Sequence, residues 1–127
     1  MRTLVVIPAY NEEAALPTTL ADLARAQPAI HVVVVDDGST DRTRLVAQAG
    51  GATVVTLPFN LGVGSAVRTG LRYALEHGYA RAVVFDADGQ HDAAAIDDLL
   101  GALDRGADVA LASRFGAGAE AYPVSRI

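Results

Sequence analysis

The chain has 127 residues, 51% of them hydrophobic, a net charge of −5 and no cysteine, which suits one domain, residues 1–127, and excludes a disordered chain. The acidic balance argues against a nucleic-acid partner, and the absence of cysteine excludes disulfides and thiolate metal sites and fits a reducing compartment. No apolar run approaches the roughly 20 residues of a membrane span, and the run before Pro8 is too short for a signal sequence, so the composition predicts a soluble, cytoplasmic protein.

Apolar, β-branched runs alternate strictly with helix-like segments along the chain. The predicted strands cover residues 4–7, 31–35, 53–57, 81–85 and 108–112. The predicted helices cover residues 12–26, 42–49, 65–77 and 92–104, and residues 115–127 are expected to form a loop. The strands are apolar throughout, which is typical of a mainly parallel, twisted sheet with helices on both faces, an α/β fold.

Turn and capping residues set the predicted boundaries of these elements. Pro8 is expected to end the first strand, and Asn11 is expected to cap the first helix. Pro17 marks either the true first turn of that helix or a kink. Asp41 or Thr40 is expected to cap the second helix.

Polar side chains follow every predicted strand. In parallel sheets of this kind, ligands bind beyond the carboxyl ends of the strands. In chain order the residues at those ends are Tyr10–Asn11–Glu12, Asp36–Asp37, Asn60, Asp86 with Asp88, and Ser113–Arg114. The sequence therefore predicts that polar groups from five loops converge on one edge of the sheet.

Asp86 and Asp88 directly follow the fourth predicted strand. On an extended chain, residues i and i+2 point to the same side, so both carboxylates can face one point. Two carboxylates, with the amide oxygen of Gln90 close by, suit Mg²⁺ or Mn²⁺, whose remaining ligands are usually phosphate oxygens. The alternative is a polar Asp-x-Asp-Gly turn. His91 abuts the pair as a ligand or as a donor to one.

The other loops carry weaker signals. Asp36–Asp37 is interpreted either as a contact to a ribose hydroxyl or a base N–H, or as a cap and turn. The glycines in Gly62–Val63–Gly64 match neither a nicotinamide fingerprint nor a phosphate-binding loop with lysine, and are interpreted as a tight turn that lets a helix approach the site. Arg114 can balance diphosphate charge or form a surface ion pair.

Five motifs in order resemble a known family. They are Val5–Glu13 (VVIPAYNEE), Val34–Asp41 (VVDDGSTD), Asn60–Leu61–Gly62, Phe85–His91 (FDADGQH) and Ser113–Arg114. Together they resemble the nucleotide-sugar-binding half of the family-two inverting glycosyltransferases, and the FDADGQH form is most similar to the polyprenol-phosphate branch, which resembles dolichol-phosphate-mannose synthase. The resemblance covers nearly the whole chain. It implies a Rossmann-like nucleotide-diphospho-sugar transferase fold of the GT-A type, lacking the C-terminal acceptor half that the family carries beyond Ser113–Arg114.

The resemblance also implies roles for individual residues. Nucleotide binding is implied for Pro8, Ala9, Tyr10, Asn11, Glu12, Asp36, Asp37, Gly62, Asp86 and Ala87. Mg²⁺ or Mn²⁺ is expected on Asp86, Asp88 and Gln90, phosphate contacts on Arg114 and Arg126, and catalytic roles on Asp88 and Arg114. The implied donor is a GDP- or UDP-linked sugar, and the implied acceptor is a polyprenyl phosphate. The metal would neutralise charge on the leaving group, and an anionic acceptor would need little help from a general base.

Several alternatives stay open. The chain alone is a fragment, a homodimer that completes its site across an interface, or a nucleotide-sugar-binding module without turnover, and association with the inner face of the membrane is also left open. A haloacid-dehalogenase-type phosphatase would match Phe85–Gly89, but Gln90 stands where that motif has Thr or Val, and no lysine follows it. A nucleotidyltransferase would need a glycine-rich, arginine-bearing loop after the first strand, which the sequence lacks.

Overall fold

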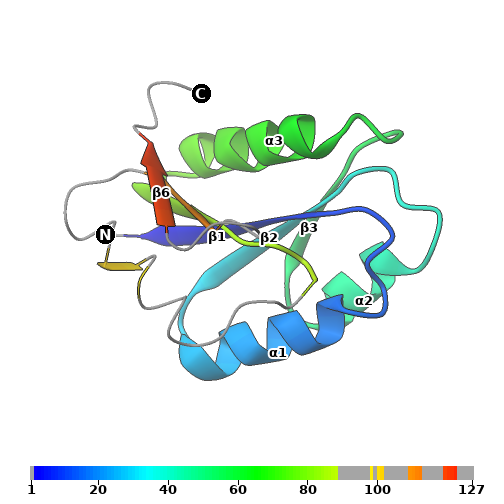
Figure 1. The fold of residues 1–127 in the computed structure, drawn as a ribbon, viewed down its shortest axis with the longest axis horizontal. Coiled ribbons are helices and arrows are strands. Elements are labelled where there is room, and N and C mark those ends of the chain that lie inside the picture. Colours follow the sequence, from blue (N-terminus) through cyan, green and yellow to red (C-terminus); the bar gives the residue numbers. More distant parts are fainter. Residues whose placement is uncertain (1, 89–97, 99, 102–108, 113–118, 123–127) are drawn as a thin grey trace.

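The computed structural model describes residues 2–88, 98, 100, 101, 109–112 and 119–122 (Figure 1). In chain order the elements are β1 (Thr3–Ala9), α1 (Leu16–Ala26), β2 (His31–Asp36), α2 (Thr43–Ala49), β3 (Thr53–Thr56), α3 (Val63–Glu76), β4 (Arg81–Val84), β5 (Val109–Ala112) and β6 (Ala119–Tyr122). Asp98, Leu100 and Gly101 are helical, in agreement with the helix predicted over residues 92–104.

The strands form one sheet in the order β3-β2-β1-β4-β5-β6. All neighbouring strands among β3, β2, β1, β4 and β5 pair in parallel, and β6 pairs with β5 in the antiparallel sense. Helices α1 and α2 cover one face of the sheet, and α3 covers the other (Figure 1). The predicted mainly parallel α/β fold is confirmed.

The buried side chains form one layer on each face of the sheet. Alternate residues of β1 enter different layers: Val5 and Ile7 pack with the α1 and α2 side chains, whereas Leu4 and Val6 pack with those of α3. Helix α3 approaches β1 closely at Gly70, where an added Cβ would lie 2.2 Å from Cγ1 of Val6. Glycine at this position therefore sets the spacing between α3 and the sheet.

The prediction that Pro8 ends the first strand is wrong. Strand β1 continues to Ala9, and Pro8 stands in register with Val35 of β2. The carbonyl of Val6 accepts from Phe85 on the β4 side, and that of Ala9 accepts from Asp37 on the β2 side. Because backbone groups alternate between neighbours, the missing N–H of Pro8 falls on the β4 side, beyond the last β1–β4 pair at Val6 and Val84. No ladder hydrogen bond is lost there.

The first helix begins later than predicted. Its N-cap is Ala15, and Pro17 occupies the first turn, which was one of the two alternatives for that residue. Asn11 is not the cap. It has φ +53°, and its side-chain oxygen accepts from the backbone N–H of Thr40 at 2.9 Å. A contact to a distant loop has replaced the local cap.

The second and third helices also differ slightly from the prediction. The N-cap of α2 is Arg42, without a side-chain cap, while Oδ1 of the preceding Asp41 accepts from the backbone N–H of Thr43 at 2.9 Å. Asp41 thus performs the predicted capping function from one position earlier. Helix α3 begins two residues before the expected Ser65.

Strand β6 corrects the expectation of a loop over residues 115–127. Residues 119–122 pair with β5, with Ala112 opposite Ala119 and Val109 opposite Tyr122. Alanine and glutamate favour strands weakly, so the pairing with β5 rather than local preference accounts for this element. Within the part of the chain that the structure describes, no helix is both long and apolar enough to cross a membrane.

Candidate functional site at the carboxyl edge of the sheet

A pocket of about 390 Å³ lies at the carboxyl ends of the central strands β1 and β4. This is the point where the strand order reverses, because the chain runs outward from β1 to β3 and then returns to β4 on the other side of β1. Ligands of open parallel sheets bind at such points. The pocket is lined by Pro8, Ala9, Tyr10, Glu12, Asp37, Asn60, Gly62, Val63, Ala66, Asp86, Ala87 and Asp88.

Residues 85–88 alternate between the core and the pocket. Phe85 and Ala87 are 2% and 4% exposed and belong to the core layer under α1. Asp86 and Asp88 line the pocket, and the Oδ2 atom of Asp86 is closed off from solvent. The backbone N–H of Phe85 extends the sheet by donating to the carbonyl of Val6 at 2.9 Å. The two carboxylates therefore lie at the same pocket, on the side that their spacing predicted, although Ala87 and Asp88 already form a turn.

The Asp86 and Asp88 pair fits a divalent cation that takes its other ligands from a substrate. The described residues hold no cluster of three or more His, Cys, Asp and Glu side chains around a common point. Mg²⁺ and Mn²⁺ are commonly held by one or two carboxylates, with phosphate oxygens and water completing the shell. The predicted third ligand, Gln90, lies outside the described residues.

Asp37 fastens the loop between β3 and α3 to the end of β2. Its carboxylate is buried and accepts from the backbone N–H of Leu61 at 2.8 Å and of Gly62 at 3.0 Å. Its own N–H donates to the carbonyl of Ala9. Hydrogen bonds to an ionised acceptor are stronger than neutral ones, so Asp37 holds three chain segments together at the pocket.

Gly38 allows the same loop to lie close to the β2–α2 turn. It has φ +71°, and a Cβ at this position would lie 2.3 Å from the carbonyl carbon of Phe59 and 2.4 Å from the nitrogen of Asn60. A side chain is therefore excluded both by the backbone conformation and by space. The close approach brings Asn60 to the pocket wall.

The loop after β1 is tied to the loop after β2. The backbone N–H of Asn11 donates to Oγ of Ser39, and that of Glu12 donates to Oγ1 of Thr43, both at 2.9 Å. The N–H of Glu13 donates to Oδ2 of Asp41 at 3.3 Å. These contacts fix the segment that carries Tyr10 and Glu12 into the pocket.

Asp41 has a shifted pKa in this loop. Desolvation raises its pKa, but hydrogen bonds from the hydroxyl and backbone N–H of Thr43 and from the N–H of Glu13 outweigh it, so the net pKa lies below the ordinary value of 3.8. These donors favour the ionised form. The charged Asp41 therefore stabilises the tie between the two loops.

Most of the residues predicted for the site meet at this pocket. Those that line it are Pro8, Ala9, Tyr10, Glu12, Asp37, Gly62, Asp86, Ala87 and Asp88. Asn11 and Asp36 do not line it. The side chain of Asn11 holds Thr40, and Oδ1 of Asp36 accepts from the N–H of Ser39 at 3.0 Å. Arg114 and Arg126 lie outside the described residues, as does Gln90.

Three pocket residues were not predicted as site residues. Asn60 was placed at the edge of the sheet without a role, and Val63 and Ala66 come from the first turn of α3. Helix α3 begins directly after Gly62, so its first turn lies at the pocket. Because the predicted helix started only at Ser65, Val63 was not placed in this first turn.

The fold, with its pocket at the carboxyl edge of the sheet, is similar to that of solved glycosyltransferases of the GT-A type. The structure is similar to that of glucosyl-3-phosphoglycerate synthase from Mycobacterium tuberculosis in complex with Mn²⁺ and UDP-glucose, with a TM-score of 0.68 and 29% identity, over 83% of this chain and 40% of that one. Residues 4–126 match the model of glycosyl transferase family 2, and the chain belongs to this family.

Relatives with similar sequences indicate a particular branch of this family. The chain is 39% identical over 120 residues to a polyprenol monophosphomannose synthase of Mycolicibacterium smegmatis, covering 90% of this chain and 45% of the relative. It is 40% identical over 119 residues to an undecaprenyl-phosphate mannosyltransferase of Micrococcus luteus, covering 90% and 49%. The chain thus spans about half the length of these relatives. The resemblance to the polyprenol-phosphate branch is confirmed.

Proposed function

We propose that this chain binds a nucleoside-diphosphate sugar in the carboxyl-edge pocket together with Mg²⁺ or Mn²⁺, and that it serves the transfer of the sugar to a polyprenyl phosphate. One observation carries the proposal: Asp37, Asp86, Asp88 and Glu12 line a single pocket at the switch point of the sheet. A diphosphate beside these carboxylates would be repelled unless a cation lay between them. The acidic lining therefore favours a ligand that arrives with a divalent metal.

The pocket residues divide into two groups by position. The segment from Pro8 to Glu12 and Asp37 lie at the ends of β1 and β2 and are proposed to hold the nucleoside, with Asp36 bracing the turn beside them. Asp86 and Asp88 lie after β4 and are proposed to face the diphosphate. Gln90, Arg114 and Arg126 are proposed to complete the metal and phosphate contacts. GDP and UDP are the proposed leaving groups.

When bound, a divalent cation neutralises charge on the nucleoside-diphosphate leaving group. The role proposed for the chain is to orient that group and to keep the two carboxylates at one wall of the pocket. Attack by an acceptor phosphate from the face opposite the leaving group would invert the sugar. The names of the two relatives support a polyprenol or undecaprenyl phosphate as acceptor.

Thermal melts test the donor site directly. Wild type and Asp88→Asn are melted with UDP, GDP, AMP and NAD, each with and without Mn²⁺, and Asp98→Asn, at an exposed helical position, is the matched control. A ligand at a hundred times its Kd adds about 2.7 kcal/mol, which raises Tm by several degrees. We expect an Mn²⁺-dependent rise with UDP or GDP in wild type and Asp98→Asn, and none in Asp88→Asn. No rise with any nucleotide in the folded wild type would overturn the proposal.

A second candidate is a nucleotide-sugar-binding module without turnover. Because the chain spans about half the length of these relatives, turnover by this stretch is a separate proposal from donor binding. Consumption of the sugar nucleotide that depends on added polyprenyl phosphate would exclude it. An NMR spectrum of the product would test inversion, since the new linkage should have the opposite anomeric configuration to the donor.

A further inference from the structure

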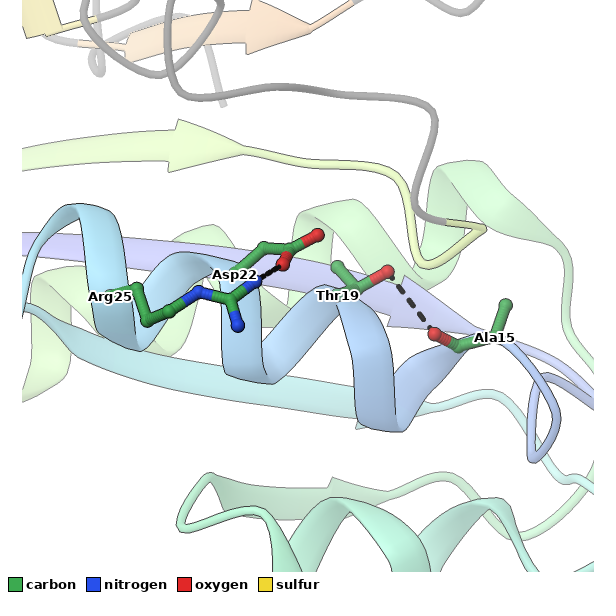
Figure 2. A network of polar contacts seen from close by, with 4 residues as sticks. All are labelled: Ala15, Thr19, Asp22 and Arg25. Atoms are coloured by element: carbon green, nitrogen blue, oxygen red, sulfur yellow. Dashed lines mark hydrogen bonds and ion pairs between the residues drawn. The ribbon is translucent and has the colours of Figure 1, made fainter.

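Thr19 of α1 reaches the segment that carries the two pocket aspartates. Its side chain is 2% exposed, and Oγ1 lies 3.0 Å from the carbonyl oxygen of Ala87, 68 residues further along the chain. Oγ1 also lies 3.3 Å from the carbonyl oxygen of Ala15, one turn earlier in the helix (Figure 2). Bonding back to residue i−4 is common for threonine in helices. The contact to Ala87 is not a consequence of the helix.

A hydroxyl has one proton for these two acceptors. The carbonyl of Ala15 already accepts the backbone N–H of Thr19 at 3.2 Å, which is the regular helical hydrogen bond. The contact to Ala87 is the shorter of the two side-chain contacts. The hydroxyl proton therefore serves the carbonyl of Ala87 better than that of Ala15.

The carbonyl of Ala87 belongs to the peptide group that joins Ala87 to Asp88. The side chain of Ala87 is buried in the layer that includes Leu16 and Leu20 of α1, so α1 holds both this side chain and this carbonyl. Fixing the peptide plane fixes the positions of the nitrogen and Cα of Asp88, from which its side chain leaves the backbone. Helix α1 thereby orients an acid of the pocket without contributing to the pocket lining.

We propose that Thr19 is a positioning residue for Asp88, and that loss of its hydroxyl weakens the binding of Mn²⁺ together with a nucleoside diphosphate. This inference rests on the proposed function. Groups that orient metal ligands typically change metal affinity by 10–100-fold when removed. Thr19 acts through the backbone next to the ligand, so the lower end of that range, about tenfold, is expected.

The variants separate the hydroxyl from the shape of the side chain. Thr19→Val keeps the shape and removes the donor, and Thr19→Ser restores the donor on a smaller side chain. Thr18→Val makes the same change at the exposed neighbouring position. Tyr79→Phe removes the contact of its hydroxyl with His31 at the far edge of the sheet and controls for a general loss of stability. If Thr19→Val does not fold, Thr19→Ala takes its place.

Free Mn²⁺ is followed by its EPR signal during titration of each variant with Mn²⁺ alone, with UDP and with GDP, well below Tm. In the presence of whichever of UDP and GDP the wild type binds, we expect Thr19→Val to bind Mn²⁺ about tenfold more weakly than wild type. Thr19→Ser, Thr18→Val and Tyr79→Phe should bind Mn²⁺ as tightly as wild type. A Thr19→Val affinity equal to that of wild type overturns the inference and leaves the proposed function intact. Equal weakening in Thr19→Val and Thr19→Ser also overturns it. Absence of binding in the wild type overturns both proposals.

Discussion

The carboxyl edge of the sheet carries the pocket described above, and a larger pocket lies at the amino edge. That pocket measures about 480 Å³, against about 390 Å³ at the carboxyl edge. The amino-edge pocket has His31, Tyr73 and Tyr79 among its lining residues, but none of its described lining residues is a carboxylate. Volume alone would therefore select the edge opposite the proposed site.

Polar groups at the amino edge contact one another. The guanidinium of Arg2 lies 4.2 Å from the ring centre of Tyr79 and donates to the carbonyl of His77 at 3.1 Å. The hydroxyl of Tyr79 lies 2.6 Å from Nδ1 of His31. These contacts join β1, β2 and the turn before β4. The polar groups of the amino edge serve stability, whereas the carboxyl edge gathers acids around a pocket. The direction of the strands, rather than pocket size, is the reason for proposing the site at the carboxyl edge.

The largest loss of stability and of nucleotide binding at the carboxyl edge is expected from Gly38→Ala. The added Cβ would meet the backbone of Phe59 and Asn60, and alanine is strained at φ +71°. We expect a loss of about 3 kcal/mol in the free energy of unfolding, together with loss of the nucleotide-dependent rise in Tm. Gly64→Ala is the control, since a Cβ there meets nothing within 4 Å, and it should change stability by less than about 1 kcal/mol. Wild-type stability in Gly38→Ala would contradict the close approach.

Asp37→Asn should have the next largest effect. The amide keeps one acceptor oxygen and loses the other, so one of the N–H groups of Leu61 and Gly62 loses its acceptor and the other keeps only an uncharged one. We expect a loss of about 2 kcal/mol in chemical denaturation and a weaker nucleotide effect on Tm. Asp98→Asn serves as the exposed control. An unchanged midpoint in Asp37→Asn would show that this clamp does not hold the loop.

Tyr79→Phe sharpens the comparison from the other edge. It removes the hydroxyl that contacts His31 and leaves the ring under Arg2 in place. We expect a loss of about 1 kcal/mol in the free energy of unfolding, with the nucleotide-dependent rise in Tm unchanged. Loss of that rise would mean that the two edges are coupled, against the division of roles drawn above.

The smallest effect is expected from Asp41→Asn, because Asp41 is partly exposed. Its folded pKa lies below the ordinary 3.8, so its charge adds stability above the unfolded pKa, and that stability is lost as pH falls through the folded pKa. The free energies of unfolding of wild type and Asp41→Asn should thus differ at neutral pH and converge below about pH 4. Urea denaturation from about pH 3 to pH 7 measures this difference, and a pH-independent difference would contradict the assignment.

The sequence predicted those features that depend on local pattern. The period-two alternation of residues 85–88 placed Asp86 and Asp88 on one side, and apolar runs placed the five parallel strands. The sequence did not predict contacts between distant loops. Asn11 looked like a helix cap because its partner, Thr40, lies 29 residues away. Strand β6 was missed because its sequence, AEAY, favours a strand only when β5 is beside it.

Contacts between distant segments also decide which residues line the pocket, and the sequence did not predict them. The carboxylates of Asp36 and Asp37 are adjacent and equally buried, at 3% exposed each. Asp36 bonds within its own turn, and only a contact 24 residues along the chain assigns Asp37 to the β3–α3 loop. Adjacent identical residues cannot be told apart by composition or spacing.

The contact between Thr19 and Ala87 has a consequence for the order of events during synthesis. The first helix leaves the ribosome 68 residues before the segment that it orients. Strands β1, β2 and β3 pair among themselves. Asp86 and Asp88, however, join the pocket only when β4 inserts beside β1. A nucleotide bound through these two residues, as proposed, cannot stabilise the nascent domain until then, so the ligand would favour the insertion of β4 and leave the pairing of β1, β2 and β3 unaffected.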